Sequence, residues 1–280
     1  MTDSVRRAIG IDQVDLTGKM VVLEEQHGSD GNFLVNTMIS HALERGNGIC
    51  LVLFHNTFGH YHNIGMKLGY NLNVLRERGE VTVVEPMKMI ADEIGHDEVD
   101  ASSEEISEDL RKKINENIIP DAMKLDEDLV LHLFEALKKK YYEAAQVREK
   151  VTVIVDDLSH LFDMNLSLAD VWTYVRFLRS LMQYEPKMSI CIMTHTYRTN
   201  TDTCQPDIIV VGLRRMAHLS VIVEPLATGH ANDISGKMAV VWRIDALRKK
   251  HHWPEKMDYL YKLLDRQIKV FPPGGKDALS

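Results

Sequence analysis

Five short apolar runs alternate with polar or amphipathic segments, and this alternation constrains the fold more than any other feature of the chain. The runs cover residues 19–23, 49–54, 81–85, 151–155 and 188–193. Residues 49–54 are apolar at every position, which is typical of a strand buried on both faces of a parallel sheet. Residues 32–45, 61–68, 130–141 and 168–182 read as helices between the strands. The pattern predicts an α/β fold with a doubly wound, mainly parallel sheet.

The last third of the chain predicts an antiparallel extension of this sheet. Residues 219–224 and 238–243 read as later strands, and 259–263 and 267–271 as a terminal hairpin around Asp265 and Arg266. The 280 residues fit one large domain, which we assign as residues 1–280. Within it, residues 92–120 are expected to form an acidic surface insertion, because nine of the eighteen residues from 92 to 109 are Asp or Glu and none is basic.

Composition and charge narrow the classes of function. The chain has 33 Lys and Arg against 41 Asp and Glu, and a net charge of -8 argues against non-specific duplex binding by the whole surface. Its three cysteines form no CxxC pair, which indicates a reducing compartment. The first nineteen residues contain no apolar core segment of a signal peptide. We therefore expect a soluble intracellular protein without a membrane partner.

A glycine-bearing turn follows the first strand, where a P-loop stands in nucleotide-binding sheets. A P-loop needs a Lys for the terminal phosphates and a Ser or Thr hydroxyl for magnesium. When Gly31 is aligned with the second glycine of GxxxxGK[ST], Gln26 replaces the first glycine, Asn32 the Lys and Phe33 the hydroxyl residue. We interpret these four residues as a degenerate P-loop, and we predict no ATP hydrolysis, no catalytic residue and no cofactor.

Two acidic residues, Asp156 and Asp157, follow the apolar run 151–155. At the end of a buried strand in an ATPase, such a carboxylate holds a magnesium-bound water. Alternatively, both carboxylates cap the next segment or face solvent. We favour the second interpretation because the loop lacks its Lys and its hydroxyl.

Histidines raise the question of a metal site, since His55, His60 and His62 lie close together in sequence. No Cys or carboxylate stands near them, so a further ligand would have to come from elsewhere. We therefore interpret them as polar loop residues and predict no metal site. His195 follows the run 188–193 without a recognisable nucleophile motif, and we assign it no catalytic role.

Basic residues gather in the second half of the chain. Arg248, Lys249 and Lys250 lie close to Trp253, and an aromatic ring among cations can stack a base. A short run of this kind is also common in solvated loops. Arg198, in the polar loop after the fifth strand, is a further candidate. We take these five residues as candidate RNA contacts.

Several short motifs together resemble the sixth-subunit family of Elongator, the complex that modifies wobble uridines in transfer RNA. The resemblance covers residues 18–271 and rests on Asp30-Gly31-x-Phe33-Leu34-Val35, Gly65-x-Lys67-Leu68-Gly69, Arg76-Glu77-Arg78-Gly79, Val155-Asp156-Asp157-Leu158-Ser159, and Leu226-Ala227-Thr228-Gly229 with Gly236 and Trp242. It implies a RecA-like ATPase fold without the usual nucleotide motifs.

The resemblance also implies partners and a role. Family members form a heterohexameric ring with the fourth and fifth Elongator subunits, and the ring binds transfer RNA and docks on the catalytic assembly. Catalysis then belongs to another subunit, and the compartment is the cytoplasm, with the nucleus as a second location.

Two alternatives stay open: an active RecA-like ATPase of DNA repair or ring assembly, and a Rossmann-type small-molecule enzyme such as a methyltransferase. An intact P-loop Lys would favour the first, and a glycine-rich cofactor loop the second.

Overall fold

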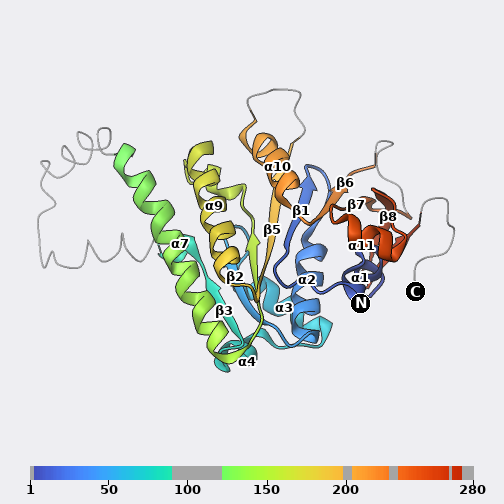
Figure 1. Ribbon diagram of the computed structural model, residues 1–280, viewed down its shortest axis with the longest axis horizontal. Coiled ribbons are helices and arrows are strands. Elements are labelled where there is room, and N and C mark those ends of the chain that lie inside the picture. The colour runs from blue at the N-terminus through green and yellow to red at the C-terminus, as the bar shows by residue number, and fades with distance from the viewer. Residues whose placement is uncertain (1–2, 90–121, 198–203, 227–232, 265–266, 273–280) are drawn as a thin grey trace, which may run out of the picture.

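A single nine-stranded sheet forms the centre of the molecule (Figure 1). The computed structural model describes residues 3–89, 122–197, 204–226, 233–264 and 267–272. Across the sheet the strands follow the order β3-β2-β4-β5-β1-β6-β7-β8-β9. Their bounds are Met20–Gln26 (β1), Gly48–Leu53 (β2), Val81–Val84 (β3), Val151–Asp156 (β4), Met188–Thr196 (β5), Leu219–Glu224 (β6), Gly236–Trp242 (β7), Met257–Leu264 (β8) and Gln267–Phe271 (β9).

The first six strands in this order, β3, β2, β4, β5, β1 and β6, are parallel to one another. Strands β7, β8 and β9 are antiparallel to their neighbours. This arrangement confirms the predicted fold class. The central strands are buried along nearly their whole length, including the polar residues at the carboxyl ends of β1 and β4. All six parallel strands end at one edge of the sheet, so the loops after β1, β2, β4 and β5 lie near one another there.

Helices cover both faces of the sheet (Figure 1). One face carries α7 (Ala122–Val147), α8 (His160–Asp163), α9 (Leu168–Tyr184) and α10 (Gln205–Met216). The other carries α1 (Asp3–Ile9), the short 3-10 helix η1 (Ile11–Gln13), α2 (Asn32–Glu44), α3 (Phe58–Leu68) and α4 (Leu72–Glu77), and α11 (Asp245–His251) contacts β7. In the described part of the chain, no helix is both long enough and apolar enough to span a membrane.

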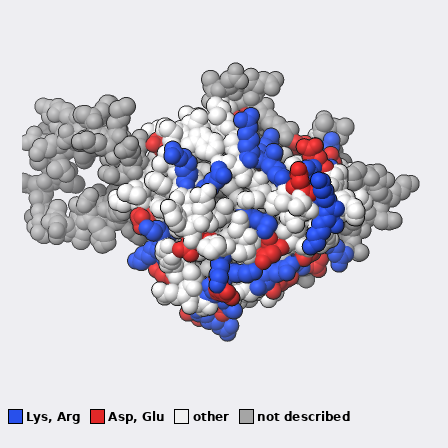
Figure 2. Space-filling view, viewed as in Figure 1, with Lys and Arg blue, Asp and Glu red and all other residues white. Residues whose placement is uncertain are grey.

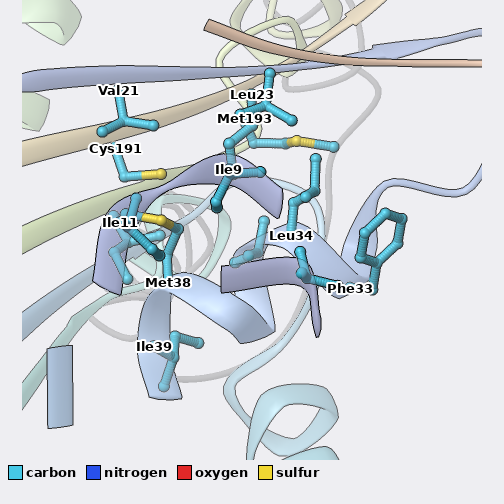
Figure 3. Packing of buried hydrophobic residues seen from close by; sticks show 14 of the residues in the cluster. Ile9, Ile11, Val21, Leu23, Phe33, Leu34, Met38, Ile39, Cys191 and Met193 are labelled. Carbon is cyan, nitrogen blue, oxygen red and sulfur yellow. The ribbon is translucent and has the colours of Figure 1, made fainter. Parts of the chain in front are cut away.

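Helix α2 packs closely beneath the strand that precedes it. Leu34 and Met38 are almost fully buried and face Leu23, Cys191 and Met193 of β1 and β5 (Figure 3). Each such side chain stabilises the fold by about 1.5–3 kcal/mol relative to full exposure. This packing fixes the start of α2 at the end of β1, which positions the glycine-bearing turn.

The structure corrects several details of the sequence analysis. From the sequence, Asp207 is a candidate cap of a helix that runs to Arg215. In the structure α10 has Cys204 as its N-cap, and the Asp207 carboxylate accepts a hydrogen bond from the backbone N–H of Tyr197. The basic residues Arg248, Lys249 and Lys250, for which a solvated loop was the alternative interpretation, lie on the helix α11. Helices α1, α4 and α8 were not predicted, because each is short and has little periodic pattern to detect. The predicted acidic insertion, residues 92–120, lies outside the described residues.

Candidate functional site

The loop after β1 approaches its own strand closely at Gly31, the N-cap of α2. The backbone N–H of Gly31 donates to Oε2 of Glu25 at 2.8 Å. A Cβ at this position would lie 2.8 Å from the same oxygen and 2.8 Å from Cε of Met193. Only glycine fits here without displacing its neighbours.

The two residues after Gly31 point into protein rather than into an open phosphate site. The Asn32 side-chain oxygen accepts a hydrogen bond from Asn56 at 3.1 Å. Phe33 is 8 % exposed and packs against the ring of Tyr261, with centroids 5.0 Å apart. Where a P-loop offers an ammonium and a hydroxyl, this loop offers an amide and a buried phenyl ring.

Asp156, the last residue of β4, is enclosed by polar groups from the neighbouring loop and helix. It is 1 % exposed, and its Oδ2 accepts hydrogen bonds from Nδ2 of Asn56 at 3.1 Å and from the hydroxyl of Tyr61. Burial and the adjacent Asp156 carboxylate raise the pKa of Tyr61 far above its usual value, so the phenol remains a donor. A hydrogen-bonded path therefore joins Asn32, Asn56 and Asp156.

Asp157 is fully buried and belongs to a second polar chain. Its Oδ1 accepts from the backbone N–H of Ser159 at 2.7 Å and from the Ser159 hydroxyl, while its Oδ2 contacts Nδ1 of His195. The other ring nitrogen of His195 lies 3.2 Å from Oε1 of Glu25. Asp157 accepts from Ser159 within the turn after β4 but does not cap α8, whose N-cap Ser159 has no side-chain capping hydrogen bond. Neither Asp156 nor Asp157 faces solvent, so the favoured interpretation of these two carboxylates is wrong.

The three histidines that are close in sequence, His55, His60 and His62, do not form one cluster in the structure. His60 and His62 lie on α3, whereas His55 contacts Nε2 of His160 on α8 and has its ring 5.9 Å from that of His195. Burial, and secondarily the nearby His55, lowers the pKa of His160. Within the residues that the structure describes, no set of three or more His, Cys, Asp or Glu side chains is arranged to hold a metal ion.

A buried ion pair beside this site was not foreseen. Glu24 of β1 is 1 % exposed and accepts two hydrogen bonds from the guanidinium of Arg214 on α10 and one from the hydroxyl of Thr196. From the sequence, Arg214 and Arg215 are expected to close the helix after the fifth strand, where cations favour the helix dipole, and no partner for Arg214 is indicated. In the sequence, the two adjacent glutamates at the end of an apolar strand could have indicated a buried ion pair, because buried carboxylates need hydrogen-bond or charge partners.

The candidate RNA contacts have different surroundings. Lys and Arg side chains gather over α11 (Figure 2), where Lys249 and Lys250 are exposed and Arg248 pairs with Asp245. Trp253 stacks on Trp242 and on His251, with centroids 5.5 and 4.6 Å apart. An open pocket beside the helix is lined by Asp245, Arg248, Lys249, His252, Trp253 and Pro254. Arg198 lies outside the described residues.

Comparison with known proteins finds relatives in sequence and a similar solved structure. The Elongator complex protein 6 of Homo sapiens is 27 % identical over 265 residues, covering 94 % of this chain and 93 % of the relative. The protein of that name from Drosophila melanogaster is 26 % identical over 275 residues and covers 98 % of both chains. A KaiC-like protein from Pyrococcus horikoshii has a similar structure, with a TM-score of 0.52, 10 % identity and coverage of 91 % and 90 %, a likeness that concerns the fold alone.

The family described as Elongation complex protein 6 matches residues 9–265, nearly the full length of the chain. The match confirms the resemblance of this chain to the family. The chain belongs to the Elongator complex protein 6 family, with a RecA-like fold of the kind seen in KaiC-like proteins.

Proposed function

We propose that this chain is a non-catalytic RecA-like subunit of a heterohexameric Elongator ring, which binds transfer RNA and supports wobble uridine modification. Membership of the family makes the chain an Elongator subunit and thus part of a multi-subunit complex. The ring with the fourth and fifth subunits, the transfer RNA and the location in cytoplasm and nucleus are parts of the proposal that the family resemblance implies.

The observation that carries the non-catalytic assignment is the replacement of the two chemical groups of a P-loop. Asn32 binds Asn56 through its amide and has no charge to place on a phosphate. Phe33 is buried against Tyr261 and cannot coordinate magnesium. Since phosphoryl transfer depends almost entirely on such positioned charges, their replacement supports a scaffold role.

An ATPase assay of the purified full chain tests this assignment. We expect no magnesium-dependent ATP hydrolysis by the wild-type chain. The Asp156→Asn and Asp157→Asn variants are assayed beside it. Turnover in the wild type that disappears in either variant would favour the alternative of an active RecA-like ATPase.

Assembly is tested by isolating the protein from its own cells and identifying its partners by mass. Ile208 and Val211 lie one turn apart on α10 and are 38 % and 48 % exposed, which suits a surface that another subunit covers. We expect the fourth and fifth Elongator subunits in equal amounts. Recovery of a stable monomer without related subunits would contradict the ring.

RNA binding is tested by salt titration of the assembled ring. In this acidic subunit, exposed Lys249 and Lys250 on α11 and the candidate Arg198 are the groups that we propose bind phosphates. Lys249→Glu with Lys250→Glu, and separately Arg198→Glu, should weaken binding and reduce the salt slope by about 0.7–0.9 for each phosphate that is no longer neutralised. Unchanged affinity and slope with an intact ring would assign RNA binding to the partner subunits.

A further inference from the structure

A buried carboxylate of β1 reaches the loop between β1 and α2 and accepts a backbone N–H at the start of the helix, where such loops can receive a phosphate. A helix N-terminus with free backbone N–H groups attracts anions. Here the Glu25 carboxylate, on a side chain that is 11 % exposed, accepts the N–H of Gly31. The anion therefore comes from the strand that leads into the loop.

The space around this carboxylate is closed by the chain itself. The ideal Cβ position at Gly31 lies 2.8 Å from Glu25 Oε2 and 3.1 Å from Cγ2 of Val223 on β6. A phosphate group could reach the Gly31 N–H only if the carboxylate moved away. The glycine that a P-loop uses to approach a nucleotide is used here to approach Glu25.

His195 holds the carboxylate from the opposite side. Its Nε2 lies 3.2 Å from Glu25 Oε1, and its Nδ1 contacts Asp157. The two nitrogens of this one imidazole ring therefore bridge the carboxylates of Glu25 and Asp157. Asp157 is in turn anchored by Ser159, whose hydroxyl also accepts the backbone N–H of His195 at 3.1 Å.

We propose that Glu25 is a built-in anion that keeps the loop closed without a nucleotide, and that His195 is the residue that positions it. The contacts link the ends of β1, β4 and β5 through the buried residues Glu25 and Asp157 and through His195, whose side chain is 25 % exposed. The loop of this subunit then holds one conformation whatever the nucleotide concentration. This inference concerns the chain alone and does not depend on ring assembly or RNA binding.

Amide hydrogen exchange of residues 28–36 in the full chain tests the proposal. Glu25→Ala removes the anion, and Glu25→Gln keeps its size without its charge. His195→Gln removes only the positioning contact. The matched control is Glu80→Ala, because Glu80 has a side chain 15 % exposed and an Arg148 partner but belongs to the turn before β3. Each variant is measured in chloride and in inorganic phosphate of equal ionic strength.

We expect exchange of the loop to become about tenfold faster or more in Glu25→Ala and Glu25→Gln, and less so in His195→Gln. Phosphate, but not chloride, should slow it again in Glu25→Ala by occupying the vacated site, and should leave the wild type unchanged. Three results would overturn the proposal: unchanged loop exchange in both Glu25 variants, an equal effect of chloride and phosphate, or an equal loop response in Glu80→Ala.

Discussion

Arg214 on α10 donates to both carboxylate oxygens of Glu24 on β1, with Nε 2.6 Å from Oε2. Glu24 is 1 % exposed, whereas the Arg214 side chain retains 30 % of its exposure. The pair ties the helix on one face of the sheet to the end of the central strand. The neighbouring Glu25 points to the opposite side of the strand and accepts the N–H of Gly31, as the alternation of side chains along a strand requires.

Arg214→Ala should destabilise the fold by about 3 kcal/mol, because it leaves the Glu24 carboxylate buried with only Thr196 as a donor. Urea denaturation of the two proteins measures this difference. Arg215→Ala, at the exposed neighbouring position, is the control and should change stability by about 0.5 kcal/mol or less. Equal effects of the two substitutions would contradict a structural ion pair.

Restoring a hydroxyl to the loop should not restore a nucleotide site. Phe33→Thr removes a buried ring from its contact with Tyr261 and should cost about 2–4 kcal/mol without producing ATPase activity. Thermal unfolding and a phosphate-release assay provide the two measurements. Phe33→Leu keeps an apolar side chain and should cost less; a Thr variant as stable as wild type would show that the ring is not packed.

Two glycines with positive φ offer a matched test of the Trp253 packing. Gly10 has φ +78°, and a Cβ there would lie 2.5 Å from the Trp253 ring. Gly46 has φ +72°, with no heavy atom within 4 Å of the Cβ position. Gly46→Ala should cost about 1 kcal/mol from backbone strain, and Gly10→Ala about 1–3 kcal/mol more from the clash. If chemical denaturation gives equal losses in the free energy of unfolding for both variants, the Trp253 ring moves aside without a measurable cost.

His41 should make stability depend on pH in a defined window. Burial, with help from Arg45, lowers the pKa of His41 from 6.5 to about 4. The unfolded chain takes up the proton near pH 6.5 and the folded chain only near pH 4, so stability present above pH 6.5 is lost as the pH falls through this range. His41→Gln should flatten this part of the stability curve.

The control for that pH dependence is His132→Gln, on an exposed position of α7. This substitution should leave the slope between pH 4 and 6.5 as in the wild type. Urea denaturation across this pH range gives the free energy of unfolding of the wild type, His41→Gln and His132→Gln. A wild-type slope that persists in His41→Gln would assign the dependence to other groups.

The order of strands and helices could be read from the sequence because it depends on local patterns. Apolar runs such as 49–54 become strands wherever a sheet can bury them, and the helical period of 168–182 becomes α9. The identities of Asn32 and Phe33 after Gly31 can also be read directly from the sequence, and the proposal of a degenerate P-loop depends on them. Short elements such as α4 carried too little periodicity to be detected.

The partners of the buried polar groups were decided by tertiary structure. Glu24 and Glu25 are adjacent in sequence, yet one meets Arg214, 190 residues away, and the other meets His195 and Gly31. A local pattern shows that a buried carboxylate needs a donor, but not which strand or helix brings one within about 3 Å. That choice depends on strand order, which places the ends of β1, β4 and β5 side by side and thereby closes the loop on the chain's own carboxylate.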